Sequence, residues 1–280
     1  MKIQSAGRLG NILFIWSYAL NISLKEKCNH VEIFADRHHS IIDEDLKDTF
    51  RKLSSDELKL KVDNKSGLIL KALDKLAQFM PNQIRFAQRK LRIQTEHLDS
   101  MTDKARIQRG YFQDALYFEE IKIEVHRRLV EIIRETKFKS QLKKRFPFLV
   151  NDYQAVHVRL SDFIGSEAGV INLESQIQCL DIGIKTIICT DGTTAEVLSM
   201  IRQQDIEIVT SRETTAWETI AILSGAKVLV TSNSTLSWWS GFIAAGNKKI
   251  VWVPKVWNKK LLNSKPIPFD NVLTYDPKFI

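Results

Sequence analysis

The second half of the chain alternates short apolar runs with segments that carry apolar residues every three to four positions. The runs are rich in β-branched residues, and the intervening segments have helical periodicity. This alternation predicts strands joined by right-handed helical crossovers into a parallel sheet. The predicted strands are residues 153–159, 186–190, 206–210, 226–232 and 248–254, and the predicted helices are residues 194–204, 214–225 and 234–246. Gly225 and Gly246 stand where the caps of two of these helices are expected.

The first half begins in the same way and then becomes rich in charged residues. Strands are predicted over residues 2–6 and 30–35, an apolar helix over 12–24, and further helices over 68–80 and 117–136. Pro81 is expected to end the helix over 68–80. A length of 280 residues suits two domains, and the break at Pro147 and Asn151 places their boundary near residues 146–152. The predicted domains are therefore residues 1–150 and 151–280.

Charge adds a question about partners. The formal net charge is +8, and the basic excess lies in residues 1–150. Such a region can attract nucleic acid, an anionic membrane surface or a phosphorylated substrate, and it can also be an ordinary solvated surface. No nucleic-acid-binding motif is present, so nucleic acid is not an expected partner. The sequence has no apolar stretch of signal-peptide or membrane-span type, which predicts a cytoplasmic protein.

Candidate chemistry gathers at the predicted strand-to-helix turns, because parallel sheets bind ligands at the carboxyl ends of their strands. The first turn is GRLGN, residues 7–11. Its glycines allow a tight turn, the helix behind it offers free N–H groups to an anion, and Arg8 could add charged donors. A purely structural turn explains the same residues.

The second turn is HVRLSD, residues 157–162. His157 and Arg159 are two residues apart on a strand, so they are expected on one face, with Val156 and Val158 directed into the core. Arg159 is well placed to neutralise a diphosphate. The alternative is a buried structural histidine and an arginine paired with Asp162.

The third and fourth turns offer small polar groups. Asp191 directly follows a strand and could accept a hydrogen bond from a nucleobase or ribose, but a helix N-cap is favoured on local grounds. The segment 231–239, TSNSTLSWW, places five hydroxyl side chains and an amide between a strand and an apolar helix. This excess of donors over the one that a cap needs suits phosphate binding. Its two tryptophans are expected to be packing residues.

Several other nucleotide and metal sites are absent from the sequence. There is no GxxxxGK[ST] loop, no GxGxxG turn and no HExxH pair. Stabilisation of a leaving phosphate would then fall to an arginine and helix N-termini, without a metal ion.

Four segments resemble the motifs of glycosyltransferase family 11, the α-1,2-fucosyltransferases, in the family's order. GRLGNILFIWSYA resembles its GGLGNQLFQYA-type motif, and RGYFQDALYF is similar to its GYWQ…YF segment. VHVRLSDF resembles VHVRRGDY, and TSNSTLSWWSGFIA resembles ANSTFSWWGAWL. The resemblance implies a GT-B-like α/β fold, with two Rossmann-like domains facing a cleft. Residues 1–150 would bind mainly the acceptor and residues 151–280 the nucleotide sugar.

The resemblance also implies a reaction: inverting transfer of fucose from GDP-fucose to a glycan hydroxyl, in α-1,2 linkage to galactose, without cofactor or metal. Arg159 would contact the donor diphosphate, and Ser234 and Thr235 would hold phosphate oxygens. Asp162 is the candidate catalytic base. The full set of residues implied at the donor is Arg8, Asn11, His157, Arg159, Asp191, Glu218, Asn233, Ser234 and Thr235. The acceptor would be an oligosaccharide or a lipid-linked glycan such as an O-antigen unit, and the basic half could then rest on an anionic membrane.

The chain departs from the family pattern at several of these positions. Leu160 replaces the second arginine of HVRRGD, and Gly192 replaces the second acid of an acidic turn. Glu218-Thr219 stands where many members have Glu-Asp, at a place that related families associate with guanine. Two alternatives therefore accompany the fucosyltransferase hypothesis: a different nucleotide-sugar donor, and a catalytically silent nucleotide-sugar-binding homologue.

Overall fold

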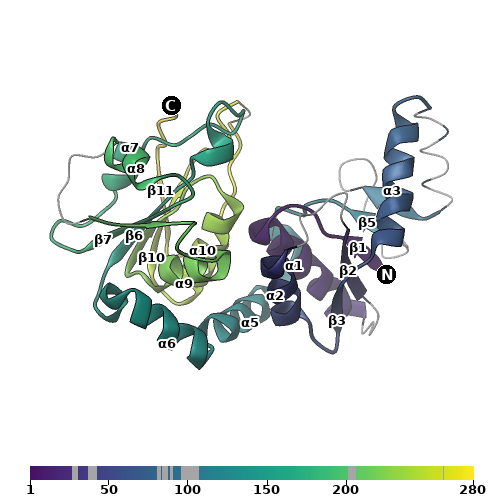
Figure 1. The fold of residues 1–280 in the computed structure, drawn as a ribbon, viewed down its shortest axis with the longest axis horizontal. Coiled ribbons are helices and arrows are strands. Elements are labelled where there is room, and N and C mark those ends of the chain that lie inside the picture. Colours follow the sequence, from purple (N-terminus) through teal and green to yellow (C-terminus); the bar gives the residue numbers. More distant parts are fainter. Residues whose placement is uncertain are drawn as a thin grey trace. The chain divides into compact units, whose positions relative to one another are not determined.

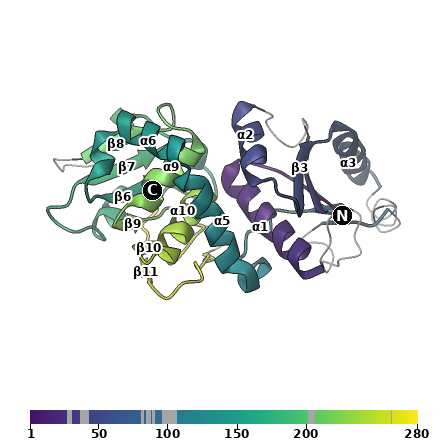
Figure 2. The same cartoon turned by 90° about the horizontal axis from the view of Figure 1, so that it is seen from below.

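The chain folds into two compact units, each built on one parallel sheet. The computed structural model describes residues 1–26, 31–36, 43–80, 91–95, 107–200, 206–260 and 262–280, together with residues 83 and 88. The units are Met1–Ile121 and Lys122–Ile280 (Figures 1 and 2). The division falls before the expected boundary at residues 146–152, because the helix that starts at Lys122 packs within the second unit: the ring Nε2 of His126 lies 3.1 Å from the carbonyl oxygen of Ile243.

The first unit has a five-stranded sheet in the order β3-β2-β1-β5-β4, with parallel pairing throughout. Its elements are β1 (Lys2–Gln4), α1 (Leu9–Glu26), β2 (Val31–Ala35), α2 (Glu44–Leu53), β3 (Leu58–Val62), α3 (Asn64–Ala77), β4 (Ile93–Thr95), β5 (Ile107–Arg109), η1 (Ala115–Tyr117) and η2 (Glu119–Ile121). The first strand, the apolar helix, the second strand and α3 were predicted. Pro81 lies outside the described residues.

The second unit has a six-stranded parallel sheet in the order β11-β10-β9-β6-β7-β8. Its elements are α5 (Lys122–Arg134), α6 (Thr136–Arg145), η3 (Pro147–Val150), β6 (Gln154–Val158), η4 (Ser161–Phe163), α7 (Leu173–Ile177), β7 (Thr186–Thr190), α8 (Thr194–Leu198), β8 (Ile206–Thr210), α9 (Ala216–Gly225), β9 (Val228–Val230), α10 (Thr235–Gly246), β10 (Ile250–Pro254) and β11 (Val272–Tyr275). The predicted alternation of strands and helices is confirmed.

Three details of the prediction are corrected. The helix expected over residues 117–136 is η1, η2 and α5 in succession, and α6 follows. Gly225 and Gly246 are the last residues of α9 and α10, and the caps are Ala226 and Asn247. The two glycines allow close packing: an added Cβ would lie 2.6 Å from the Tyr153 hydroxyl at Gly225 and 2.3 Å from the His126 ring at Gly246.

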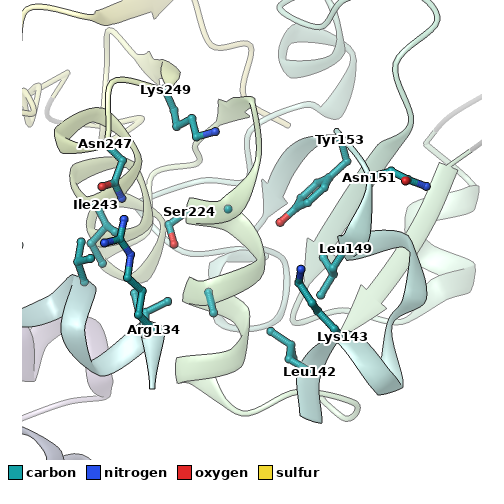
Figure 3. Close-up of a pocket in the computed structure, with 14 residues that line it drawn as sticks. Arg134, Leu142, Lys143, Leu149, Asn151, Tyr153, Ser224, Ile243, Asn247 and Lys249 are labelled. Atoms are coloured by element: carbon teal, nitrogen blue, oxygen red, sulfur yellow. The ribbon is translucent and has the colours of Figure 1, made fainter. Parts of the chain in front are cut away.

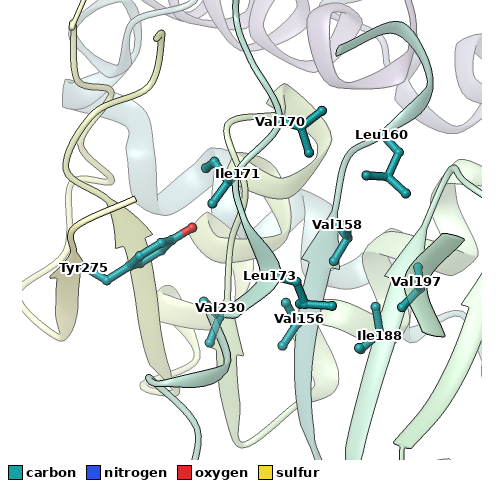
Figure 4. Packing of buried hydrophobic residues seen from close by; sticks show 10 residues of the cluster. All are labelled: Val156, Val158, Leu160, Val170, Ile171, Leu173, Ile188, Val197, Val230 and Tyr275. Atoms are coloured by element: carbon teal, nitrogen blue, oxygen red, sulfur yellow. The ribbon is translucent and has the colours of Figure 1, made fainter. Parts of the chain in front are cut away.

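The central strands of the second sheet, β6, β7 and β9, are buried on both faces, as expected for a parallel sheet covered by helices. All five residues of β6 are buried, and Val156 and Val158 belong to an apolar cluster with Ile188 and Val230 from the neighbouring strands (Figure 4). Burial of each such side chain contributes roughly 1.5–3 kcal/mol. This packed layer fixes the ends of its strands and therefore the points at which the following loops begin.

No helix in the described part of the chain combines the length and apolar character that a membrane span requires.

Candidate functional site

The carboxyl edge of the second sheet has a topological switch point at β6. The chain runs from β6 outward through β7 and β8 on one side, and through β9, β10 and β11 on the other. The loops after β6 and β9 therefore leave adjacent strands and separate, and open α/β sheets bind ligands at such points. The pairing of Val156 with Val230 brings the two strand ends together. The HVRLSD and TSNSTLSWW segments start at these ends, so two separately predicted clusters meet here.

His157 joins the two clusters from inside the sheet. Its side chain is buried, and its Nδ1 lies 3.1 Å from the Ser232 hydroxyl oxygen beyond β9. Burial, with the nearby positive charge of Arg159, lowers the pKa of His157 to about 4. The imidazole is therefore neutral near pH 7 and serves as a hydrogen-bonding group that shapes the site.

Arg159 follows β6 directly and is held by two carboxylates. Its guanidinium lies 2.7 Å from Asp162 Oδ1 and 2.8 Å from Asp191 Oδ2, and its side chain is only 14% exposed. The pairing with Asp162 was the structural alternative considered for this residue, and it is present. Its Nε is buried and has no hydrogen-bond partner among the described residues. The two carboxylates thus fix the orientation of the guanidinium, and they leave its Nε–H unused.

Asp191 has a different role from the helix cap that local reasoning favoured. The N-cap of α8 is Thr193, whose hydroxyl accepts the Glu196 N–H in a capping box. The Asp191 carboxylate instead accepts the Leu160 N–H at 2.7 Å and the Ser161 hydroxyl, and so fixes the loop after β6. Burial alone would raise its pKa, but these hydrogen bonds and the Arg159 charge outweigh burial and lower it. Asp191 is therefore an ionised anchor for Arg159.

Leu160 and Gly192, two departures from the family pattern, are in contact. Leu160 is 1% exposed, and a Cβ added at Gly192 would lie 2.5 Å from its Cδ1. The space that a side chain at position 192 would need is thus filled by the side chain at position 160. The two departures are physically coupled.

We expect Gly192→Ala to lower the free energy of unfolding by about 1–3 kcal/mol, the usual range for overpacking. In a Leu160→Ala background the same change should be milder, with a coupling energy of about 1 kcal/mol or more. Urea denaturation of the four proteins of this cycle measures the coupling. Equal destabilisation by Gly192→Ala in both backgrounds would show that the contact does not limit residue 192.

The start of α10 is a buried turn that lacks a side-chain capping hydrogen bond. Ser234 is its N-cap, but the serine side chain makes no capping hydrogen bond, and the first turn contains no acidic residue. Thr235, the first helical residue, is half-buried. Asn233 is buried and donates to the carbonyls of Ala168 and Gly169 at 3.1 and 3.0 Å, so its amide holds a neighbouring loop. Helix N–H groups and two hydroxyls therefore remain for a ligand.

Glu218 is committed to internal contacts. It is the third residue of α9, where its carboxylate accepts the Thr215 N–H at 2.8 Å and pairs with Arg145 at 2.5 Å. The Thr219 hydroxyl lies 3.0 Å from that of Thr214. Glu218 and Thr219, the positions that the family resemblance links to guanine recognition, therefore make contacts within the first turn of α9.

Arg8 and Asn11 belong to the first unit. Arg8 is exposed at the start of α1, and its carbonyl accepts the N–H groups of Asn11 and Ile12. Gly7 has φ +81°, and a Cβ there would lie 2.3 Å from the Asn11 Nδ2, so the predicted need for glycine in this turn is confirmed. Gln113 donates to the Asn11 Oδ1 at 2.9 Å, which joins the GRLGN and RGYFQD segments.

One supporting residue, Gln176, was missed from the sequence, and another, Ser237, was identified only as a member of the TSNSTLSWW cluster. Gln176 on α7 donates to the carbonyls of His157 and Thr231 at 3.0 and 3.2 Å, bridging β6 and β9 where the switch point opens. Ser237 accepts the Ser232 N–H at 2.8 Å and fixes the turn before α10. Nothing in the spacing of Gln176 marks it, whereas Ser237 lies within a cluster that was identified.

Comparisons with known proteins support the architecture. No protein-family model and no curated protein sequence matches the chain. Among solved structures, the glycosyl transferase family 9 protein from Veillonella parvula aligns with a TM-score of 0.55 at 12% identity, covering 98% of this chain and 86% of its own. The fucosyltransferase NodZ from Bradyrhizobium, as the selenomethionine protein, aligns with a TM-score of 0.51 at 13% identity, covering 87% of this chain and 92% of its own.

At these identities the comparisons establish the fold. Both proteins align over most of their length and of this chain. The prediction of two Rossmann-like domains of the GT-B type is confirmed. Membership of family 11 stays a prediction, since it rests on the sequence motifs alone.

Proposed function

We propose that this protein is a glycosyltransferase that binds its nucleoside-diphosphate sugar at the carboxyl edge of the second sheet. The observation that supports the proposal is that Arg159 follows β6 and the uncapped start of α10 follows β9, two paired strands whose carboxyl ends meet at the switch point. A guanidinium and helix N–H groups together stabilise a diphosphate without a metal ion. The GT-B fold is consistent with this chemistry.

The donor has to compete with the carboxylates that already hold Arg159. The Asp191 side chain is 10% exposed and accepts the Leu160 N–H, whereas the Asp162 side chain is 54% exposed. Asp162 is therefore the more solvated of the two partners, and the one that a diphosphate can replace more readily. In this proposal the diphosphate replaces Asp162 at the guanidinium, and Asp191 keeps Arg159 oriented.

The favoured reaction is transfer of fucose from GDP-fucose to a galactose hydroxyl with α-1,2 linkage. The acceptor oxygen forms a bond to the anomeric carbon as the bond to the diphosphate oxygen breaks, with inversion. Arg159 and the start of α10 stabilise the negative charge that leaves on GDP. Asp162, released from Arg159 by the donor, would take the proton of the acceptor hydroxyl. From the family resemblance, we further propose that Arg8 and Asn11 contact the donor. The same resemblance suggests a lipid-linked glycan as the acceptor.

Asp162→Asn separates the role of base from that of ion-pair partner. If Asp162 takes the proton, we expect kcat to fall at least a hundredfold, the lower range for general base catalysis, with donor binding retained. Steady-state rates and calorimetric titration of GDP measure the two quantities. An unchanged kcat with tighter GDP binding would assign Asp162 only the ion pair with Arg159.

The second candidate function is transfer from a nucleotide sugar with a nucleobase other than guanine, and the contacts of Glu218 favour it. The carboxylate that could substitute in guanine recognition is bound to Arg145 and to the start of α9. A donor other than GDP-fucose would leave these contacts intact. The catalytically silent homologue predicts nucleotide binding without transfer.

A donor screen with purified protein tests the proposal. GDP-, UDP- and ADP-linked sugars would be incubated with glycan acceptors in the presence of EDTA, and release of the nucleoside diphosphate would be measured. We expect release from GDP-fucose above the rate without protein. Release from another nucleotide sugar alone would select the second candidate, and release from none, with GDP still bound, would indicate the silent homologue.

A further inference from the structure

A cavity with polar and apolar lining lies within the second unit, away from the candidate donor residues. It has a volume of about 430 Å³ and is bordered by α5, α6, η3, α9 and α10 (Figure 3). Tyr153, which precedes β6, and Lys249, which precedes β10, both line it. The cavity is therefore at the amino ends of the strands. A five-residue strand spans roughly 16 Å, so this cavity and Arg159 are at opposite edges of the sheet.

The lining combines an apolar wall with positive charge. Val130, Leu142, Leu149 and Ile243 supply aliphatic surface from four elements of the unit. Arg134, Lys143 and Lys249 lie on different sides of the hollow around Ser224 (Figure 3). None of the described lining residues is acidic. The cavity thus suits a ligand that has an anionic group and a hydrocarbon portion.

The three cations are available to such a ligand. Within the described part of the chain, no carboxylate forms an ion pair with Arg134, Lys143 or Lys249. Arg134 is exposed, and Lys143 and Lys249 are half-buried. Unpaired cations that converge on a partly apolar cavity repel one another, and an anion relieves that repulsion.

The sequence neighbours of the lining residues indicate a membrane surface as the source of the ligand. Val150, between the lining residues Leu149 and Asn151, is 66% exposed, and Ile250, next to Lys249, is 46% exposed. Exposed aliphatic side chains beside basic residues are typical of protein surfaces that rest on anionic lipid.

We propose that this cavity binds the phosphate headgroup and upper hydrocarbon of an anionic phospholipid, and so holds the second unit at a membrane surface. Arg134, Lys143 and Lys249 contact the phosphate, and the aliphatic wall contacts the first carbons of the lipid chain. The inference does not rest on the glycosyltransferase proposal, because it involves the opposite edge of the sheet and requires neither donor nor acceptor.

Vesicle binding of the full chain tests the inference. Phosphatidylcholine vesicles with and without phosphatidylglycerol would be titrated with the wild-type protein and with the pocket variant Arg134→Gln, Lys143→Gln, Lys249→Gln. We expect the wild type to bind only the anionic vesicles. The pocket variant should bind them at least about tenfold more weakly, because each cation near an anionic surface contributes about fivefold.

Two controls distinguish the cavity from net charge. The control variant Lys255→Gln, Lys260→Gln, Lys278→Gln removes three exposed lysines that do not line the cavity and should bind like the wild type. Ala221→Phe fills the cavity without changing charge and should weaken binding. Thermal unfolding confirms that each variant is folded.

Three results would overturn the inference. One is equal weakening by the control and pocket variants, and another is wild-type binding that does not depend on phosphatidylglycerol. The third is loss of vesicle binding when glycerol phosphate is added at the same concentration as the phosphatidylglycerol. That result would assign the cavity to a soluble phosphate ligand. Failure of the protein to release a nucleoside diphosphate in the donor screen would leave these vesicle-binding measurements unaffected.

Discussion

Arg159→Ala is expected to reduce kcat/KM for sugar transfer by roughly a hundred- to a thousandfold, the range for loss of a key transition-state donor. The reason is geometric. Arg159 is held by Asp191 after the end of β6, and α10 starts after the neighbouring strand β9, so in the proposed mechanism its charge is already in place when the diphosphate leaves. Rates with the donor identified by the screen measure the effect.

Two matched variants sharpen this test. Arg127 on α5 also pairs with two carboxylates, those of Glu124 and Glu131, but it is 53% exposed and far along the chain from the switch point. Arg127→Ala should leave kcat/KM unchanged. Arg159→Lys keeps the charge but loses the planar fork, and we expect an intermediate loss. A near-normal rate for Arg159→Ala would remove this residue from the mechanism.

Asp191→Ala is expected to lower the free energy of unfolding by about 3 kcal/mol. The change removes an acceptor of the Leu160 N–H and Ser161 hydroxyl, together with one of the two carboxylates on Arg159. Asp276→Ala is the matched control, because Asp276 forms an ion pair of the same 2.8 Å length with Lys255 but is 82% exposed. It should change stability by less than about 1 kcal/mol. Urea denaturation measures both.

The Asp191 contribution should also depend on pH. Folding lowers the pKa of Asp191, so the folded state favours the carboxylate. Its contribution is fully present above the unfolded-state pKa of about 3.9 and is lost as pH falls through the folded-state value. The stability difference between wild type and Asp191→Ala should therefore be constant near neutral pH and shrink below about pH 4. A difference that grows on acidification would contradict the assignment.

The sequence predicted the second unit more accurately than the first. β7 and β8 are β-branched runs bounded by polar residues, and their predicted bounds match the structure. The central strands β6, β7 and β9 are buried on both faces, so they read as largely apolar segments. β4 and β5 have three residues each, and β3 alternates leucine with exposed or half-exposed lysine, so these strands lack a comparable signal.

The candidate site was predictable as a set of residues but not as a set of contacts. Parallel topology alone places Arg159 and Ser234 at one edge, and the structure brings their strands together as neighbours. Asp191 was taken for a cap because aspartate at such a turn commonly is one, whereas Thr193 has the better placed hydroxyl for that role. The contact between Leu160 and Gly192 joins residues from different turns, and no local pattern could show it.

The most direct test of the central claim is a crystal structure of the protein with GDP. We expect the diphosphate to lie within hydrogen-bond distance of the Arg159 guanidinium and of the Ser234 and Thr235 hydroxyls, with the Asp162 carboxylate displaced and Asp191 still in place. A diphosphate bound elsewhere, with the Arg159–Asp162 pair unchanged, would contradict it.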